Sequence, residues 1–77
     1  MISPAQSLAA RGLLNLSQVK LARLANINGS LLRDFEKGRR KPTIKELEAI
    51  CRALEAKGVE FTNDEQPGAR LRKGTGT

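Results

Sequence analysis

The sequence predicts a mostly α-helical fold in which four short helices are followed by a C-terminal β-hairpin. Apolar residues recur at helical spacing from residue 4 to residue 57, which indicates amphipathic helices. Serine, threonine, asparagine and glycine, which cap or end helices, divide this region into four segments. After Gly58, apolar and polar residues alternate as they do in strands. A chain of 77 residues has room for one small domain with a thin core.

The first expected helix spans residues 4–14. Ser3 is a candidate N-cap, and the proline after it suits the first helical position, where an N–H would have no helical partner. We expect Leu8 and Leu14 to pack against the core with the alanines between them. Asn15 is the expected end of the helix, since asparagine tolerates the left-handed backbone conformation.

The second expected helix spans residues 18–25 and follows Ser17, another candidate N-cap. Ala22 is small, as a position at which two helices cross requires. The spacing predicts a single apolar face made of Leu21, Leu24 and Ala25.

A tight turn at residues 26–28 separates this helix from a third one, expected at about residues 28–36. Asn26 tolerates a positive φ, Ile27 is expected to be buried so that it holds the turn, and Asn28 is expected to cap the third helix. The apolar residues of the third helix are Leu31, Leu32 and Phe35. Two helices of this length and order make a helix-turn-helix.

A basic loop and a fourth helix follow Gly38. The loop contains Arg39, Arg40 and Lys41. Thr43 begins a T-x-x-E capping box, and an apolar stripe follows it at Ile44, Leu47, Ile50, Cys51 and Leu54. Gly58 is the expected stop, because glycine commonly follows the last turn of a helix.

The expected hairpin occupies residues 59–73. Residues 59–62 and 69–72 alternate at period two, and residues 63–68 between them are rich in turn formers. We expect residues 74–77 to be a flexible tail.

This hairpin is the predicted dimer interface, with Val59, Phe61 and Leu71 as its contacts. An isolated two-stranded hairpin is only marginally stable in water, and free strand edges pair with other chains. Small domains also gain stability by adding a second subunit. The alternative is that the hairpin simply covers the core of its own chain.

Composition favours a polyanionic partner and excludes several other classes of protein. The net charge is +6 and the pI is about 10.3, which makes nucleic acid the leading candidate. With one cysteine and no histidine, neither an intramolecular disulfide nor a zinc site is expected. No apolar run reaches membrane-spanning length and no signal peptide is evident, so we expect a cytoplasmic protein. No nucleophile-and-base pair or phosphate-binding glycine loop is present, so we expect neither an enzyme nor a cofactor.

The stretch LSQVKLARLANINGSLLRDFEKGRRKP resembles the Cro/CI-repressor-like (XRE-type) helix-turn-helix domains. Twelve positions fit their pattern: Leu16, Ser17, Gln18, Leu21, Ala22, Ala25, Ile27, Leu32, Phe35, Glu36, Gly38 and Pro42. Asn26 replaces the usual glycine and Asn28 the usual serine. The resemblance implies a lambda-repressor-like four-helix domain over residues 1–58. The segments GVEF and GARLRK near the C-terminus resemble the corresponding part of short bacterial regulators that carry a C-terminal hairpin.

The resemblance also implies a role for each site residue. Arg11 and Glu36 would form an ion pair that ties the first helix to the third. Phosphate contacts would come from Gln18, Lys37, Arg39, Arg40 and Lys41, and base contacts from Asn28, Gly29, Ser30, Arg33 and Asp34. The alternatives are a Gln18 side chain bonded to its own backbone and a basic loop that is simply solvated.

The predicted base-reading residues differ in chemistry. The guanidinium of Arg33 suits O6 and N7 of guanine, although a surface ion pair with Asp34 is an alternative. Asp34 suits the amino group of cytosine, or it repels phosphate. Gly29 has no side chain with which to read a base and permits close approach of the helix. Leu31 is expected to point partly outward, towards a thymine methyl group.

These features predict a bacterial or phage regulator of transcription that binds specific sequences of double-stranded DNA as a homodimer. Its expected role is that of a repressor or autoregulator. Two such helices would enter successive major grooves of a pseudo-palindromic operator. No small-molecule ligand is expected, because no second domain is evident. The alternative function is an antiactivator or antitoxin that uses the same fold to bind a protein partner.

Overall fold

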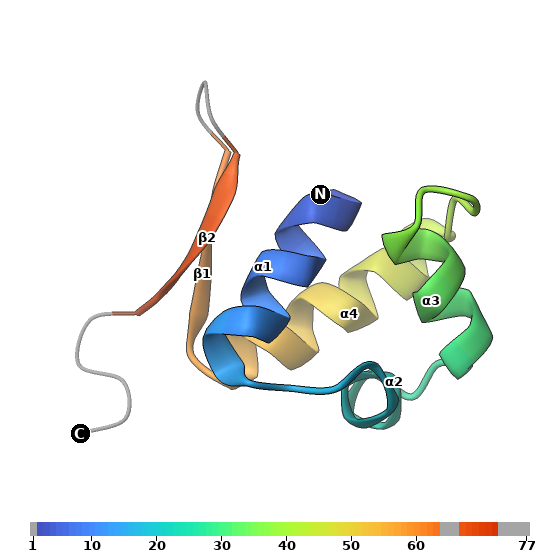
Figure 1. The fold of residues 1–77 in the computed structure, drawn as a ribbon, viewed down its shortest axis with the longest axis horizontal. Helices are drawn as coiled ribbons and strands as arrows, with labels where there is room; N and C mark the ends of the chain where they lie inside the picture. Colours follow the sequence, from blue (N-terminus) through green and yellow to red (C-terminus); the bar gives the residue numbers. More distant parts are fainter. Residues whose placement is uncertain (1, 64–66, 73–77) are drawn as a thin grey trace.

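A computed structural model of the chain describes residues 2–63 and 67–72. Its elements are α1 (Pro4–Leu14), α2 (Gln18–Ala25), α3 (Gly29–Glu36), α4 (Ile44–Ala56), β1 (Val59–Thr62) and β2 (Gly68–Leu71). Four helices and a two-stranded antiparallel hairpin confirm the predicted fold class (Figure 1). Part of the predicted hairpin loop (residues 64–66), Lys73 and the predicted tail (74–77) lie outside the described residues.

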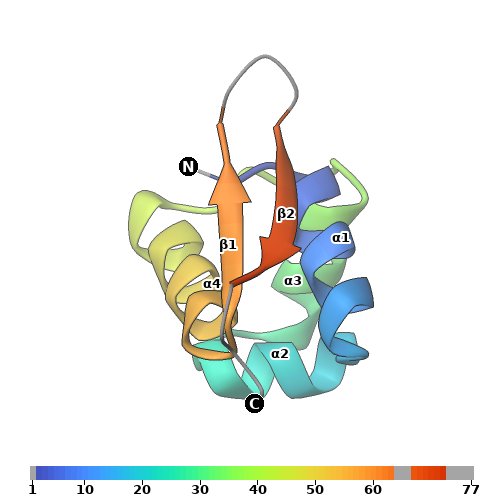
Figure 2. The same ribbon diagram turned by 90° about the vertical axis from the view of Figure 1, so that its left-hand side faces the viewer.

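The hairpin and α3 lie at opposite ends of the molecule. In Figure 1 the hairpin stands at one end of the longest axis, which measures 33 Å, and α3 lies at the other end. Seen from the hairpin end, β1 lies over the side of α4 and β2 over the side of α1 (Figure 2). The core lies between these helices and α2.

Each helix begins at the cap that the sequence predicts. The side chains of Ser3, Ser17, Asn28 and Thr43 accept hydrogen bonds from backbone N–H groups in the first turn of their helices. Asn15 and Asn26 end α1 and α2 in the left-handed conformation, with φ of 52° and 57°. These local signals explain why the helix boundaries could be read from the sequence.

The core is aliphatic, apart from Phe35. Its buried residues are Ile2, Ala10, Leu21, Ala22, Ala25, Leu32, Phe35, Ile50, Leu54 and Val59. Leu47 and Cys51 pack against this core, as their place in the α4 stripe predicted.

Three of the residues expected in the core are exposed instead. Leu8 lies on the outer side of α1, because Gln6, Ser7 and Ala10 form its buried side. Leu24 is 45% exposed, because the buried face of α2 is turned towards Ala22. Ile44 is 71% exposed in the first turn of α4, beyond the edge of the core.

The inner face of the hairpin covers the core of its own chain. Val59 pairs with Leu71 and Phe61 with Ala69, and alternation of side chains puts these four residues on one face. Val59 is 1% exposed, so the structure removes it from the predicted dimer contacts, whereas Phe61 is half-buried and Leu71 half-exposed. This packing agrees with the alternative interpretation of the hairpin. The strand β2 also begins one residue earlier than expected.

A buried glutamine that the sequence did not single out joins α1 to the hairpin. The Gln6 side chain is almost fully buried, and its Nε2 donates to the carbonyl oxygens of Thr62 (3.0 Å) and Gly68 (3.1 Å). Its Oε1 accepts from the backbone N–H of Ser3 at 2.9 Å and so completes a capping box. One side chain therefore holds both strands at the loop end of the hairpin.

Candidate nucleic-acid interface

An open groove lies between the start of α2 and the exposed face of α3. It is lined by Gln18, Val19, Asn28, Gly29, Ser30 and Arg33. Five of these six are residues that we predicted to contact bases or phosphates. The turn at residues 26–28 brings them together, because it places the start of α3 beside the start of α2.

The exposed face of α3 is polar and has few partners within the protein. The Asn28 Oδ1 accepts from the Ser30 N–H at 2.7 Å, which leaves the Asn28 amide nitrogen facing solvent. Arg33 is exposed and Asp34 is half-buried, yet neither forms an ion pair within the described parts of the chain. The Arg33 guanidinium is therefore available to a ligand.

Leu31 does not belong to this face, contrary to expectation. It is 3% exposed, because it lies four residues before the core residue Phe35 and so shares the inner side of α3. Apolar contact with a thymine methyl group is therefore excluded for Leu31.

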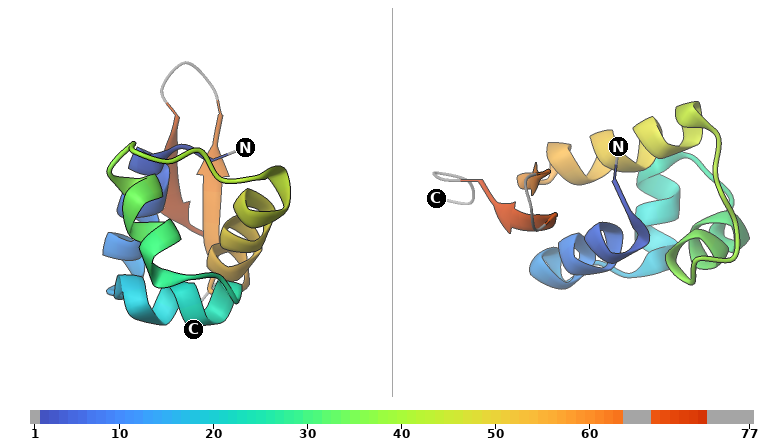
Figure 3. Two further views of the ribbon diagram at one scale, coloured as in Figure 1. Left: turned by 90° about the vertical axis from the view of Figure 1, so that its right-hand side faces the viewer. Right: turned by 90° about the horizontal axis from the view of Figure 1, so that it is seen from above.

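The basic loop leaves the C-terminal end of α3 and crosses to α4 (Figure 3, left). Its cations, Lys37, Arg39, Arg40 and Lys41, are all exposed. None of the four forms an ion pair among the residues that the structure describes. Gly38 turns the chain with a φ of 74°, and Pro42 is buried where the loop reaches α4. Both ends of the loop are therefore anchored while its charges face solvent.

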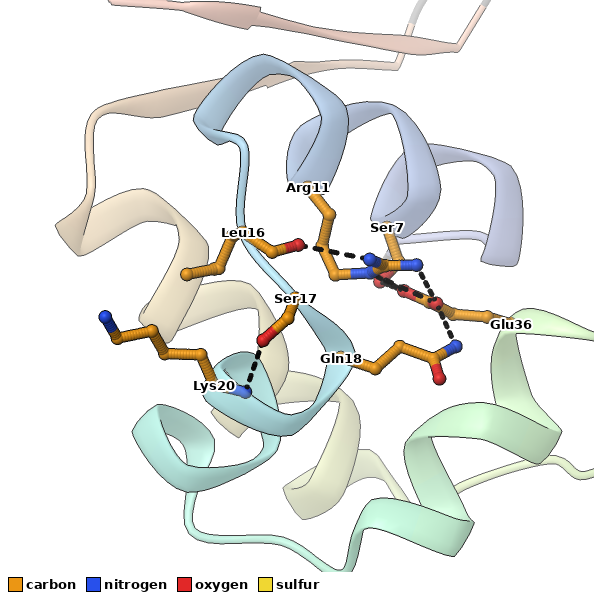
Figure 4. A network of polar contacts seen from close by, with 7 residues as sticks. All are labelled: Ser7, Arg11, Leu16, Ser17, Gln18, Lys20 and Glu36. Atoms are coloured by element: carbon orange, nitrogen blue, oxygen red, sulfur yellow. Dashed lines mark hydrogen bonds and ion pairs between the residues drawn. The ribbon is translucent and has the colours of Figure 1, made fainter.

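The buried carboxylate of Glu36 links α1, α2 and α3 behind the groove (Figure 4). Glu36 is 6% exposed, and the Arg11 Nη2 lies 2.7 Å from its Oε1 while the Arg11 Nε donates to Oε2 at 3.0 Å. Ser7 donates to Oε2, and the Gln18 Nε2 donates to Oε1 at 2.8 Å. We call these residues the Glu36 network: Ser7, Arg11, Gln18 and Glu36.

The Glu36 network favours the ionised carboxylate. Burial alone would raise the pKa of Glu36, but hydrogen bonds from Arg11, Ser7 and Gln18 and the charge of Arg11 outweigh burial and hold that pKa below its ordinary value. The carboxylate charge is thus balanced within the protein and ties α3 to both α1 and α2.

Gln18 has a hydrogen-bond partner within the protein, Glu36, that was not predicted, and Ser7 belongs to the same network. One amide hydrogen of Gln18 is used by Glu36, so only the other is free to face the groove. Ser7, which is fully buried, was not among the predicted site residues. The spacing of Ser7 and Arg11, four residues apart on α1, was the available signal that both face the same way.

A family model described as Helix-turn-helix matches residues 8–61, which is more than half of the chain. The chain belongs to this family, and the match confirms the resemblance to the Cro/CI-like (XRE-type) DNA-binding regulators. No curated protein matches the chain significantly. None of the described helices is long and apolar enough to cross a membrane.

Proposed function

We propose that this member of the helix-turn-helix family regulates transcription by placing α3 in the major groove of a specific DNA sequence. The observation that carries the proposal is the Arg33 guanidinium, which lines the groove and has no ion-pair partner in the described chain. The loop that follows α3 adds four exposed cations that form no ion pair with the described residues. Such a surface suits a ligand that offers base edges and phosphates at the same time.

Base reading is assigned to the exposed face of α3. Arg33 would donate to O6 and N7 of a guanine, a contact that discriminates by about 1–3 kcal/mol. Asn28 and Ser30 would contact neighbouring base edges from the first turn of the helix, and Asp34 would accept from a cytosine amino group. These contacts give sequence preference.

Phosphate contacts are assigned to Gln18 and to the basic loop, residues 37–41. Lysine and arginine that neutralise phosphates release counterions, so this part of the affinity should fall steeply as salt rises. The Glu36 network supports both kinds of contact, because it holds α3 and Gln18 in one fixed relation.

Gly29 supports close approach of α3 to DNA. A Cβ added at this position would meet no atom of the described chain within 4 Å, so packing within the protein does not require a glycine there. Without a side chain, the backbone at the start of α3 can come nearer to the groove floor than a larger residue would allow.

We further propose that two chains bind as a homodimer to a pseudo-palindromic operator. Their α3 helices would enter successive major grooves about 34 Å apart. Bound at a promoter, the dimer would act as a repressor or autoregulator by blocking polymerase.

Footprinting on the DNA that flanks the gene of this protein tests the proposal. We expect protection of a pseudo-palindrome, together with a gel shift of that fragment at low salt. The matched comparison is the Arg33→Ala variant. It should no longer protect the pseudo-palindrome but should still bind DNA non-specifically. No shift at low salt would contradict DNA binding and would favour the alternative, a fold that binds another regulator.

A further inference from the structure

Val19 lines the groove between α2 and α3, and of the six lining residues it alone has no assigned contact. Its side chain is 63% exposed, although valine is apolar. Single exposed apolar residues are common on protein surfaces, so exposure alone would not single out Val19. Its position does, because Val19 stands in the first turn of α2, on the surface that the proposed function turns towards DNA.

The protein holds the Val19 side chain in a fixed place. Ser17 caps α2 by accepting from the Lys20 N–H at 3.1 Å, which orders the turn that contains Val19. The Gln18 side chain donates to Glu36 at 2.8 Å and ties the same turn to α3. A valine in a helix keeps largely to one rotamer, because its branched β-carbon crowds the preceding turn. Two methyl groups are therefore offered to the groove at little cost in side-chain entropy.

The groove has room for a base edge beside Val19. Gly29, on the α3 side of the groove, carries no side chain, and a Cβ added there would meet no atom within 4 Å. Val19 therefore leaves the space above Gly29 open. Leu31, which we expected to offer an apolar contact from α3, is buried. The apolar side chain that this groove offers to a ligand is thus Val19, from α2.

The chemistry of the major groove matches an apolar side chain to thymine. Guanine, adenine and cytosine offer hydrogen-bond donors and acceptors there, whereas thymine also offers its apolar 5-methyl group. Val19 packed against a donor or acceptor would leave that group without a hydrogen bond, which costs free energy. Val19 packed against a methyl group removes apolar surface of both partners from water.

We propose that Val19 reads a thymine in each half-site by packing its methyl groups against the 5-methyl group of that base. This inference rests on the proposed function, in which α3 lies in the major groove, and it adds a specificity determinant on α2. Arg33 and Val19 divide the recognition, since Arg33 selects guanine by hydrogen bonds and Val19 selects thymine by apolar contact. Because both line one groove, the two bases lie in the same half-site.

Operators that differ by a single methyl group test this contact. The probe is a duplex that the wild-type chain selects from a pool of random DNA sequences. Each thymine is replaced in turn by uracil, which keeps the hydrogen-bonding edge of thymine and lacks only its 5-methyl group. At one thymine of each half-site, removal of the methyl group should weaken wild-type binding about fourfold, the effect of exposing one buried methyl-sized group.

Val19→Ala should remove this sensitivity, so that the thymine and uracil duplexes bind with equal affinity. Alanine is a better helix former than valine, and Val19 is largely exposed, so the melting temperature of the variant should not fall. Leu24→Ala is the matched control. It shortens another exposed apolar residue of α2 that does not line the groove, and it should keep the difference between the two duplexes.

5-Methylcytosine provides a second test, because it carries the same methyl group at the same position of a different base. With cytosine in place of the sensitive thymine, methylation of that cytosine should strengthen wild-type binding about fourfold. The same methylation should leave the affinity of Val19→Ala unchanged.

A selected duplex without a methyl-sensitive thymine, or a uracil effect that persists undiminished in Val19→Ala, would overturn the proposal. Equal weakening of all duplexes by Val19→Ala would overturn it too, since Val19 would then pack against the sugar–phosphate backbone. These results leave the proposed function intact, because the chain would still select a duplex. Selection of no duplex would instead contradict DNA binding itself, and the reading of thymine with it.

Discussion

The two ends of the molecule each carry an arginine–glutamate pair, but the pairs differ in burial. Arg11 and Glu36 join α1 to α3, with side chains that are 17% and 2% exposed. Arg70 and Glu60 join the two strands, with side chains that are 68% and 42% exposed. An exposed pair contributes little to stability, whereas breaking a buried pair leaves a charge without a partner. Only the first pair, then, can fix the position of a functional element.

The remaining cations show a second difference between the ends. At the hairpin end, Arg70 pairs with Glu60, and the Arg72 Nη2 donates to the carbonyl oxygen of Glu55 at 2.7 Å. At the α3 end, neither Arg33 nor the cations of the basic loop form an ion pair within the described residues. Lys20, Arg23, Lys45 and Lys57 are also exposed and form no ion pair among the described residues, so the α3 end is distinguished by having several such cations close together in one loop.

The largest effect should come from breaking the buried pair. Arg11→Ala leaves the Glu36 carboxylate without its cation and should lower the free energy of unfolding by about 3–5 kcal/mol. Arg70→Ala at the exposed pair is the matched control and should lower it by about 0–1 kcal/mol. Urea unfolding monitored by circular dichroism measures both. Equal losses would remove the distinction between the two ends.

The buried pair should also make stability depend on pH. Since the folded-state pKa of Glu36 lies below its ordinary value of 4.5, the carboxylate stabilises the fold fully above that ordinary value. This contribution should disappear as the pH falls through the lowered pKa of the folded state. Unfolding measured from about pH 2 to pH 7 should show the decline in the wild type and a flatter profile in Glu36→Gln. A Glu36→Gln profile as steep as that of the wild type would assign the decline to other groups.

Removal of the unpaired arginine of α3 should have an intermediate effect. Arg33→Ala should lose about 1–3 kcal/mol of discrimination at one base pair in each half-site, because alanine cannot donate to guanine. Competition binding with operators that are changed at single positions measures this loss. If preference is unchanged at every base pair, Arg33 does not read bases.

Loss of one loop cation should weaken binding to all sequences alike. Arg40→Ala should reduce the slope of log K against log salt by about one, without a change in sequence preference. Arg70→Ala removes the same charge at the hairpin end and should leave that slope unchanged. Equal effects of the two variants would indicate that total charge decides binding, whatever its position.

Local features made the fold predictable from the sequence. Ser3, Asn28 and Thr43 cap helices through contacts that span only two or three residues, so their positions are visible in the chain itself. The outward residues of α3 follow from the same periodicity. The burial of Leu31 was not predicted, because the buried face of α3 is wider than expected and includes it.

Long-range contacts were not predictable in the same way. Gln6 reaches the hairpin across more than fifty residues of sequence, and Ser7 reaches Glu36 across twenty-nine. Alternation in the hairpin revealed that Val59 and Phe61 share a face, but only the packed structure shows that this face turns inwards.

The smallest expected effect concerns Gly29, and it separates stability from binding at the α3 end. Gly29→Ala adds a Cβ that meets nothing within 4 Å, and alanine favours the helix by up to about 1 kcal/mol, so the free protein should become slightly more stable. If Gly29 serves close approach to DNA, the same methyl group should weaken operator binding severalfold. Gly12→Ala on α1 is the matched control, since it adds the same group to another open helix position. A Gly29→Ala variant that gains stability and binds its operator unchanged would show that the glycine has no part in docking.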